Sequence, residues 1–170
     1  MTSKSMFVFV ASAALSLGTA AIEIAATDAI AADPAEQHAF TLAARGVQIY
    51  ECRAGTWAFV APEAELFDAH GHSAGTHGAG PFWQARDGSR IVGAVKRRAE
   101  APQSGAIPWL LLVAYGRGGS GLFGEVSSIQ RVNTRGGSAP ASTCASAGKV
   151  LRVPYTADYR FFKVLDRSQP

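Results

Sequence analysis

Hydrophobic and polar residues alternate along several short stretches of the chain, and glycine, proline and other turn-forming residues separate these stretches. An alternation with a period of two is typical of β-strands, because successive side chains point to opposite faces. The pattern predicts strands at residues 47–52, 56–60, 64–68, 90–96, 109–115, 128–133 and 159–165. Such short, regularly spaced strands predict an all-β fold: a single antiparallel β-sandwich or barrel-like domain with long Gly/Ser/Ala-rich loops.

Three segments say more about the arrangement of the strands. Residues 109–115 are apolar throughout, which predicts a strand buried on both faces at the centre of the fold. Residues 35–44 follow a helix-start motif, but Phe40 and Leu42 also fit the alternation of a strand. Residues 122–132 carry hydrophobic positions at near-helical spacing. We expect strands in both of these ambiguous segments.

The beginning of the chain is typical of an export signal. A positively charged start precedes a short apolar run at residues 6–17, which is well below the roughly 20 residues of a membrane span. An Ala-x-Ala cleavage site follows at residues 29–31, and a second option lies near Ala20. We expect residues 1–31 to be a signal peptide and residues 32–170 to form one soluble β domain. This domain would be periplasmic or extracellular, with no membrane span after signal removal.

Charge and composition exclude one class of partner. The formal net charge of the chain is +3, and its one basic run, at residues 96–98, is short and lies beside Glu100. Nucleic-acid binding needs a larger basic stripe with interleaved aromatic residues. We therefore expect no nucleic-acid partner.

The two cysteines, Cys52 and Cys144, both lie in the expected mature domain. A pair of thiols in an exported chain predicts a disulfide, since oxidising compartments keep such pairs closed. The bridge would close a loop of about 92 residues and stabilise the fold by roughly 4–5 kcal/mol. The pair lacks the close spacing of a redox or metal motif.

Residues 71–75 match the G-x-S-x-G pattern of a serine hydrolase elbow, with Ser73 as the nucleophile. That motif requires a helix directly after the serine, but residues 76–81 contain glycine and proline and cannot start one. The only later histidine is His77, four residues on, which does not fit the usual triad order. We expect no catalytic serine, and a secreted hydrolase of an unrecognised kind stays an alternative.

Residues 116–121 match the G-x-G-x-x-G pattern of a dinucleotide site and follow an apolar strand. The pattern binds pyrophosphate only where its glycines open a helix. Gly124 interrupts the expected helix, and no acidic residue lies between Glu125 and Asp158 to bind a ribose. We therefore expect a glycine-rich hairpin loop and no cofactor.

Three histidines, His70, His72 and His77, lie close together in the sequence and could bind copper or zinc. However, residues 68–71 are typical of a turn, which would place His70 at an exposed tip. A Cu/Zn-binding protein that uses this cluster is an alternative to a structural role for the turn.

Short motifs in a fixed order run through the expected mature domain. They lie at residues 46–52, 57–66, 75–83, 87–89, 107–112, 129–140, 144 and 155–159. In these motifs the chain resembles an exported bacterial and fungal family known as domain-of-unknown-function family 3455. The resemblance implies no activity. Fungal members are often labelled malate dehydrogenase, a label that the glycine-rich segment does not support.

The resemblance also separates the candidate residues that belong to the family pattern from those that do not. His77 falls on the family pattern G-x-H-x-x-G-P-x-W, whereas His70, His72 and Ser73 fall outside it. We expect a non-catalytic binding protein for an unknown small molecule or envelope component. Its candidate ligand-binding residues are His77, Trp83, Glu63, Gln130, Arg131 and Asp158, with Trp109 as a further apolar wall. Each also has a structural interpretation, such as a pairing of Arg131 with Asp158 across strands.

Overall fold

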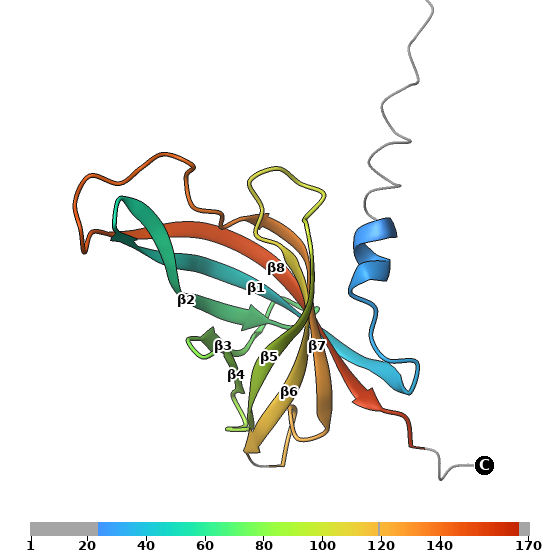
Figure 1. Ribbon diagram of the computed structural model, residues 1–170. Helices are drawn as coiled ribbons and strands as arrows, with labels where there is room; N and C mark the ends of the chain where they lie inside the picture. The colour runs from blue at the N-terminus through green and yellow to red at the C-terminus, as the bar shows by residue number, and fades with distance from the viewer. Residues whose placement is uncertain (1–23, 119, 167–170) are drawn as a thin grey trace, which may run out of the picture.

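The computed structural model describes residues 24–118 and 120–166 and shows eight antiparallel strands closed into a barrel (Figure 1). Each strand pairs with the next along the chain, and the last pairs with the first. The strands are β1 (Glu36–Arg53), β2 (Thr56–Phe67), β3 (Ser73–Gly78), β4 (Phe82–Ala85), β5 (Arg90–Ala99), β6 (Trp109–Gly118), β7 (Val126–Gly136) and β8 (Val150–Val164). The expectation of an all-β, barrel-like domain is confirmed.

The alternation of side chains located most strands but not their lengths. Both ambiguous segments contain strands, at the start of β1 and in β7. The two strands expected at residues 56–60 and 64–68 are one continuous strand, β2. Strand β4 was not predicted, because it has four residues and is too short to show a period.

The barrel closes where β1 pairs with β8, in a register that runs from Glu36 opposite Val164 to Glu51 opposite Val150. These are the two longest strands, with 18 and 15 residues. Together with β2, they extend past the other strands at the left of Figure 1, where the loop between β7 and β8 accompanies them. This pairing leaves no free sheet edge in the barrel.

Aromatic rings fill one end of the barrel. Phe40 stacks on Phe161 at 4.8 Å between ring centroids, and Phe161 lies 5.0 Å from Phe123. Phe123 is fully buried and comes from the turn between β6 and β7. The Asp87 carboxylate accepts a hydrogen bond from the backbone N–H of Leu122 at 2.7 Å and holds this turn in place. The glycine-rich segment before this turn therefore leads into a cap that closes the barrel, and no helix begins at Gly121.

A short helix at residues 24–29 lies outside the barrel against β6 and β7. The buried side chains of this outer cluster are Ala26, Ile30, Trp109, Leu111 and Val132. The helix covers only the first half of β6, since Val113 and Tyr115 on the same face are 41% and 51% exposed. The expectation of a strand buried on both faces is thus confirmed for that half alone. The expected apolar signal core and Ala20 lie outside the described residues.

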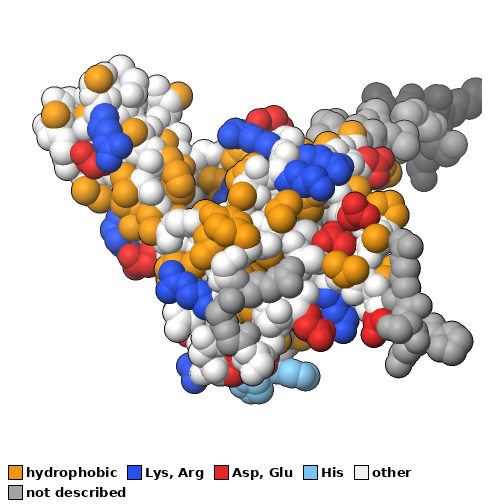
Figure 2. All heavy atoms as spheres, turned by 60° about the horizontal axis from the view of Figure 1, so that its bottom comes forward, with side chains coloured by type: hydrophobic (Ala, Val, Ile, Leu, Met, Phe, Trp, Pro, Cys, Tyr) orange, Lys and Arg blue, Asp and Glu red, His pale blue; other side chains and the backbone are white. Residues whose placement is uncertain are grey.

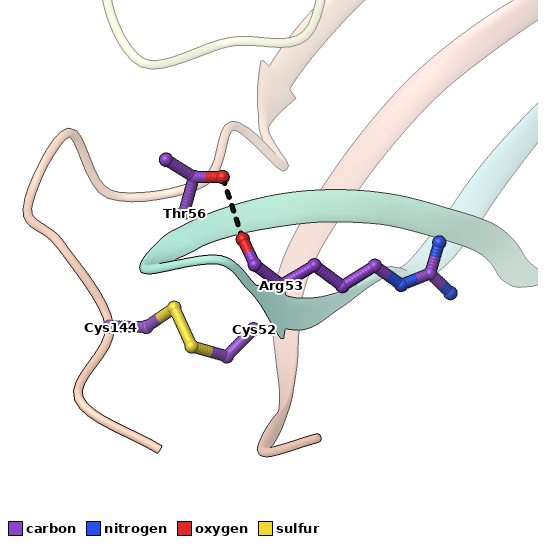
Figure 3. Close-up of a disulfide and its surroundings, with 4 residues drawn as sticks. All are labelled: Cys52, Arg53, Thr56 and Cys144. Carbon is purple, nitrogen blue, oxygen red and sulfur yellow. Dashed lines mark hydrogen bonds between the residues drawn. A yellow bond between two sulfur atoms is a disulfide. The ribbon is translucent and has the colours of Figure 1, made fainter. Parts of the chain in front are cut away.

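A disulfide joins Cys52 at the end of β1 to Cys144 in the loop between β7 and β8, as predicted (Figure 3). The Cα atoms of the two cysteines are 5.8 Å apart. Backbone hydrogen bonds support the bridge, from Cys144 N–H to Gly55 O at 3.0 Å and from Cys52 N–H to Lys149 O at 2.8 Å. The long loop is therefore fixed to the projecting ends of β1 and β2.

On the face drawn in Figure 2, lysine and arginine side chains are interspersed with acidic side chains. Among residues 24–118 and 120–166, no helix has both the length and the apolar character to cross a membrane.

We predict that the outer helix contributes to the stability of the barrel. Replacing Ile30, which is fully buried, with alanine should lower the free energy of unfolding by about 2–4 kcal/mol, because the substitution leaves a cavity beside Trp109. The matched control is Ile24→Ala in the same segment, where the side chain is 64% exposed and the expected change is below about 0.5 kcal/mol. Urea unfolding of the full chain measures both, and equal effects of the two substitutions would contradict the prediction.

Candidate functional site

A cavity of about 530 Å³ lies at the end of the barrel opposite the Phe123 cap. Side chains from all eight strands border it, together with the loops that precede β4 and β6 and follow β7. Most of the wall is apolar, with Phe59, Pro62, Val95, Leu110 and Leu112 among its residues. Its polar members are Gln48, Tyr50, His77, Trp83, Arg98, Arg131, Ser138 and Tyr159. An apolar cavity with a few polar groups is the usual form of a small-molecule site.

The strand period explains why these side chains face inward. Along β8, Tyr155, Ala157, Tyr159 and Phe161 all belong to the inner core, whereas Asp158 between them is half-buried on the outer face, opposite Val132. Along β7, Ile129 and Arg131 face the interior. Residues two apart share one face of a strand, so the same register that buries the core also points polar groups into the cavity.

His77 is sealed within the wall of the cavity and is 3% exposed. Its ring lies parallel to that of Trp83, its partner on β4, at 4.5 Å and 19°, and 4.9 Å from that of Tyr159. Its Nδ1–H donates to the backbone carbonyl of Phe82 at 2.7 Å, which fixes the tautomer because a carbonyl only accepts. Burial lowers the pKa of His77 to about 3, and the charge of Arg131 acts in the same direction. The imidazole is therefore neutral at ordinary pH.

Four buried polar atoms in and behind this wall have no hydrogen-bond partner of regular geometry among the described residues: Gln48 Nε2, Trp83 Nε1 and the hydroxyl groups of Tyr155 and Tyr159. Burial raises the pKa of both tyrosines, so they stay protonated. The two hydroxyl groups and the Gln48 amide influence one another, but no hydrogen bond of regular geometry joins them. Each unpartnered group costs about 1–3 kcal/mol, and such groups are rare in protein interiors. Their concentration here makes the cavity the candidate functional site of the described residues.

Arg131 brings a positive charge to the cavity. Its side chain is partly buried, and Nε and Nη2 both donate to the backbone carbonyl of Pro108, at 3.1 and 2.9 Å. The guanidinium also acts on the pKa of Tyr50, His77 and Tyr159, which come from three other strands. No residue described as lining the cavity is aspartate or glutamate. The described wall therefore supplies no carboxylate to balance this charge.

The structure brings three of the six candidate ligand-binding residues together in the cavity: His77, Trp83 and Arg131. Glu63 lies on the outer surface, where it accepts a hydrogen bond from Arg152 at 2.6 Å. Gln130 also faces outward and donates from Nε2 to the backbone carbonyl of Ile30 at 2.8 Å.

The pairing of Arg131 with Asp158 is wrong. Asp158 lies opposite Val132 in the register of β7 and β8, which places its side chain on the outer face, away from Arg131. Its carboxylate accepts a hydrogen bond from Asn133 at 2.8 Å. Trp109 also faces outward and borders, with Asp158, a separate depression of about 530 Å³ on the outer surface.

The three histidines of the alternative metal site do not come together. His70 and His72 lie in an exposed turn, where the Asp68 carboxylate accepts hydrogen bonds from their backbone N–H groups at 2.8 and 2.9 Å. His77 lies inside the barrel. In the part of the chain that the structure describes, no three His, Cys, Asp or Glu side chains form a group suited to a metal ion.

The serine motif also lacks the geometry of a nucleophile elbow. Ser73 begins β3 opposite Phe67, and β3 continues through Gly75 as an extended strand. A side chain at Gly75 would overlap the backbone of Gln84 on β4, so this glycine permits two strands to approach closely. The motif thus serves strand packing.

Sequence reasoning missed Gln48, Tyr50 and Tyr159 as members of the cavity wall, and Tyr155 behind it. A sequence signal for the inner face was present in β8, where the aromatic residues at positions 155, 159 and 161 all fall on one face of the strand. On sequence alone, such aromatic residues fit a core as well as a cavity wall. Only the closure of the barrel shows which of them surround a cavity.

In structural class, the chain is a disulfide-linked, closed antiparallel β-barrel with a cavity at one end. The chain belongs to the family described as "Protein of unknown function (DUF3455)", whose profile matches residues 34–163. No curated protein and no solved structure matches the chain.

We predict that His77 makes the barrel sensitive to acid. The pKa of His77 is about 3 in the folded protein, against an ordinary value of 6.5, so below pH 6.5 the unfolded chain binds a proton that the folded chain does not. This contribution of His77 to the free energy of unfolding is fully present above pH 6.5 and is lost as the pH falls toward 3. The loss is about 3 kcal/mol between pH 6.5 and pH 4. Urea unfolding at several pH values measures this loss.

The pH dependence of stability is compared in two variants. His77→Gln replaces the imidazole with a group that does not titrate, and His70→Gln makes the same change in the exposed turn. The His77 variant should lose stability less steeply with acid than the unsubstituted protein, whereas the His70 variant should keep the original slope. Identical slopes in all three proteins would show that His77 does not stay neutral in the fold.

Proposed function

We propose that this domain is an exported, non-catalytic binding protein that takes a small, largely apolar molecule into the open end of its barrel. The observation that supports this most strongly is the cavity of about 530 Å³ with its apolar wall and unpartnered polar atoms. The interior of an eight-stranded barrel is either filled by side chains or holds one small ligand. In this barrel, aromatic rings fill the capped end, and the other end has space.

The chemistry of the wall favours binding over catalysis. A general base must accept a proton near the working pH, but burial lowers the pKa of His77 to about 3. The candidate carboxylates Glu63 and Asp158 lie on the outside of the barrel, Glu63 exposed and Asp158 half-buried. The described wall thus offers hydrogen-bond donors and apolar surface, and its histidine is too weak a base for proton transfer near neutral pH.

Export is the second part of the proposal. The disulfide between Cys52 and Cys144 is typical of oxidising compartments, and the start of the sequence has the form of a signal peptide. Ala26 and Ile30 belong to the outer cluster, and the Ile30 carbonyl is the partner of Gln130. This packing favours the cleavage option near Ala20 over the one after Ala31.

The position of cleavage is open to direct measurement. We expect N-terminal sequencing of the exported protein to give a start close to Ala21, so that the helix at residues 24–29 stays on the barrel. An exported chain that begins at Ala32 would contradict this expectation.

Ligand uptake can be tested with phenylnaphthylamine, an uncharged apolar dye that fluoresces when it leaves water. We predict saturable binding with one site per chain. The blocking variant is Ala139→Trp, because Ala139 lies in a loop that borders the cavity and a large ring there fills the entrance. Binding should weaken by roughly tenfold or more, as expected when a well-packed apolar contact is lost.

The matched control is Ala141→Trp, two residues further along the same loop, where the side chain is exposed and does not border the cavity. This variant should bind the dye like the unsubstituted protein. Absence of dye binding to the folded protein, or equal losses in the two variants, would refute the proposed binding site.

A further inference from the structure

Among the residues that the structure describes, Arg131 has no counter-ion. None of the ion pairs within 4 Å among the described residues includes it. Its guanidinium donates to the neutral carbonyl of Pro108 and also interacts with the neutral hydroxyl group of Tyr159. A partly buried charge is costly unless a group of opposite charge compensates it. Arg98, the other cationic residue of the wall, lies 3.5 Å from Glu100. The Arg98 side chain is 62% exposed, so solvent and Glu100 compensate its charge, whereas Arg131 is the partly buried cation of the wall without a carboxylate partner among the described residues.

The other polar groups of the wall favour the same kind of ligand. Trp83 Nε1 and Gln48 Nε2 can only donate hydrogen bonds, and both lack an acceptor. They are buried just behind the surface of the cavity, so small side-chain movements on binding are needed to expose them. His77 is neutral and adds no second positive charge. The site thus combines one partly buried cation, Arg131, with a more exposed one, Arg98, and with buried hydrogen-bond donors and an apolar wall.

We propose that Arg131 is the anion-recognition residue of the barrel and that the ligand is an amphiphile with one acidic group, such as a carboxylate attached to an apolar body. One guanidinium balances one negative charge, and its planar set of donors matches a carboxylate. The apolar body of the ligand lies along Leu110, Leu112 and Trp83. This inference rests on the proposed ligand uptake and specifies the class of ligand.

The test compares two dyes with the same ring system: phenylnaphthylamine, which is uncharged, and anilinonaphthalene sulfonate, which carries one negative charge. The unsubstituted protein should bind the sulfonate roughly tenfold more tightly or better, because a hydrogen bond to a charged group adds to the apolar contact. In Arg131→Gln, the affinity for the sulfonate should fall by about ten- to a hundredfold, while that for the uncharged dye changes less than about twofold.

The matched control is Arg135→Gln, which removes the same charge from an exposed position of the same strand that does not border the cavity. It should leave the affinities for both dyes unchanged. Arg131→Lys retains the charge and should recover part of the preference for the sulfonate. Equal losses for both dyes in Arg131→Gln, or equal effects of Arg131→Gln and Arg135→Gln, would overturn the assignment.

A competition experiment on the unsubstituted protein needs no variant. Decanoate and decanol share an alkyl chain and differ in charge, and decanoate should displace bound phenylnaphthylamine at a roughly tenfold lower concentration. Equal displacement by the two compounds would refute anion recognition but leave the proposed uptake of small molecules intact. Failure of phenylnaphthylamine to bind at all would instead refute the uptake itself.

Discussion

The pairing of β1 with β8 is the constraint on which the rest of the structure depends. It closes the sheet from Glu36 opposite Val164 to Glu51 opposite Val150 and satisfies the backbone groups of strands that would otherwise be edges. Closure also decides which side chains face inward, since a slip of one residue would exchange the two faces of a strand. The aromatic cap, the position of His77 and the charge of Arg131 inside the barrel all follow from this register.

The two ends of the barrel differ in how their interiors are filled. At the capped end, Phe40, Phe123 and Phe161 fill the interior, and apolar burial stabilises the fold without polar cost. At the open end, Gln48 Nε2 and Tyr159 OH are buried without partners. Such groups lower stability, and proteins commonly retain them at functional sites. In the proposed function, these are the groups for which a ligand would supply partners.

The sequence predicted the fold class, the disulfide and half of the candidate site, because each depends on a local pattern or on a pair of residues. The sequence did not show that Glu63 and Asp158 lie on the outside of the barrel. Alternation assigns residues to the two faces of a strand but does not show which face lies inside the barrel. Gln48 was missed because a single amide in a strand has no sequence signal. The burial of Trp109 under residues 24–31 was also missed, because that segment was assigned to the signal peptide.

The most direct test of the central claim is a crystal structure of the protein with decanoate. We expect a closed barrel with the alkyl chain inside the cavity and the carboxylate within hydrogen-bond distance of the Arg131 guanidinium. A cavity filled by the protein's own side chains, or decanoate bound only on the outer surface, would contradict it.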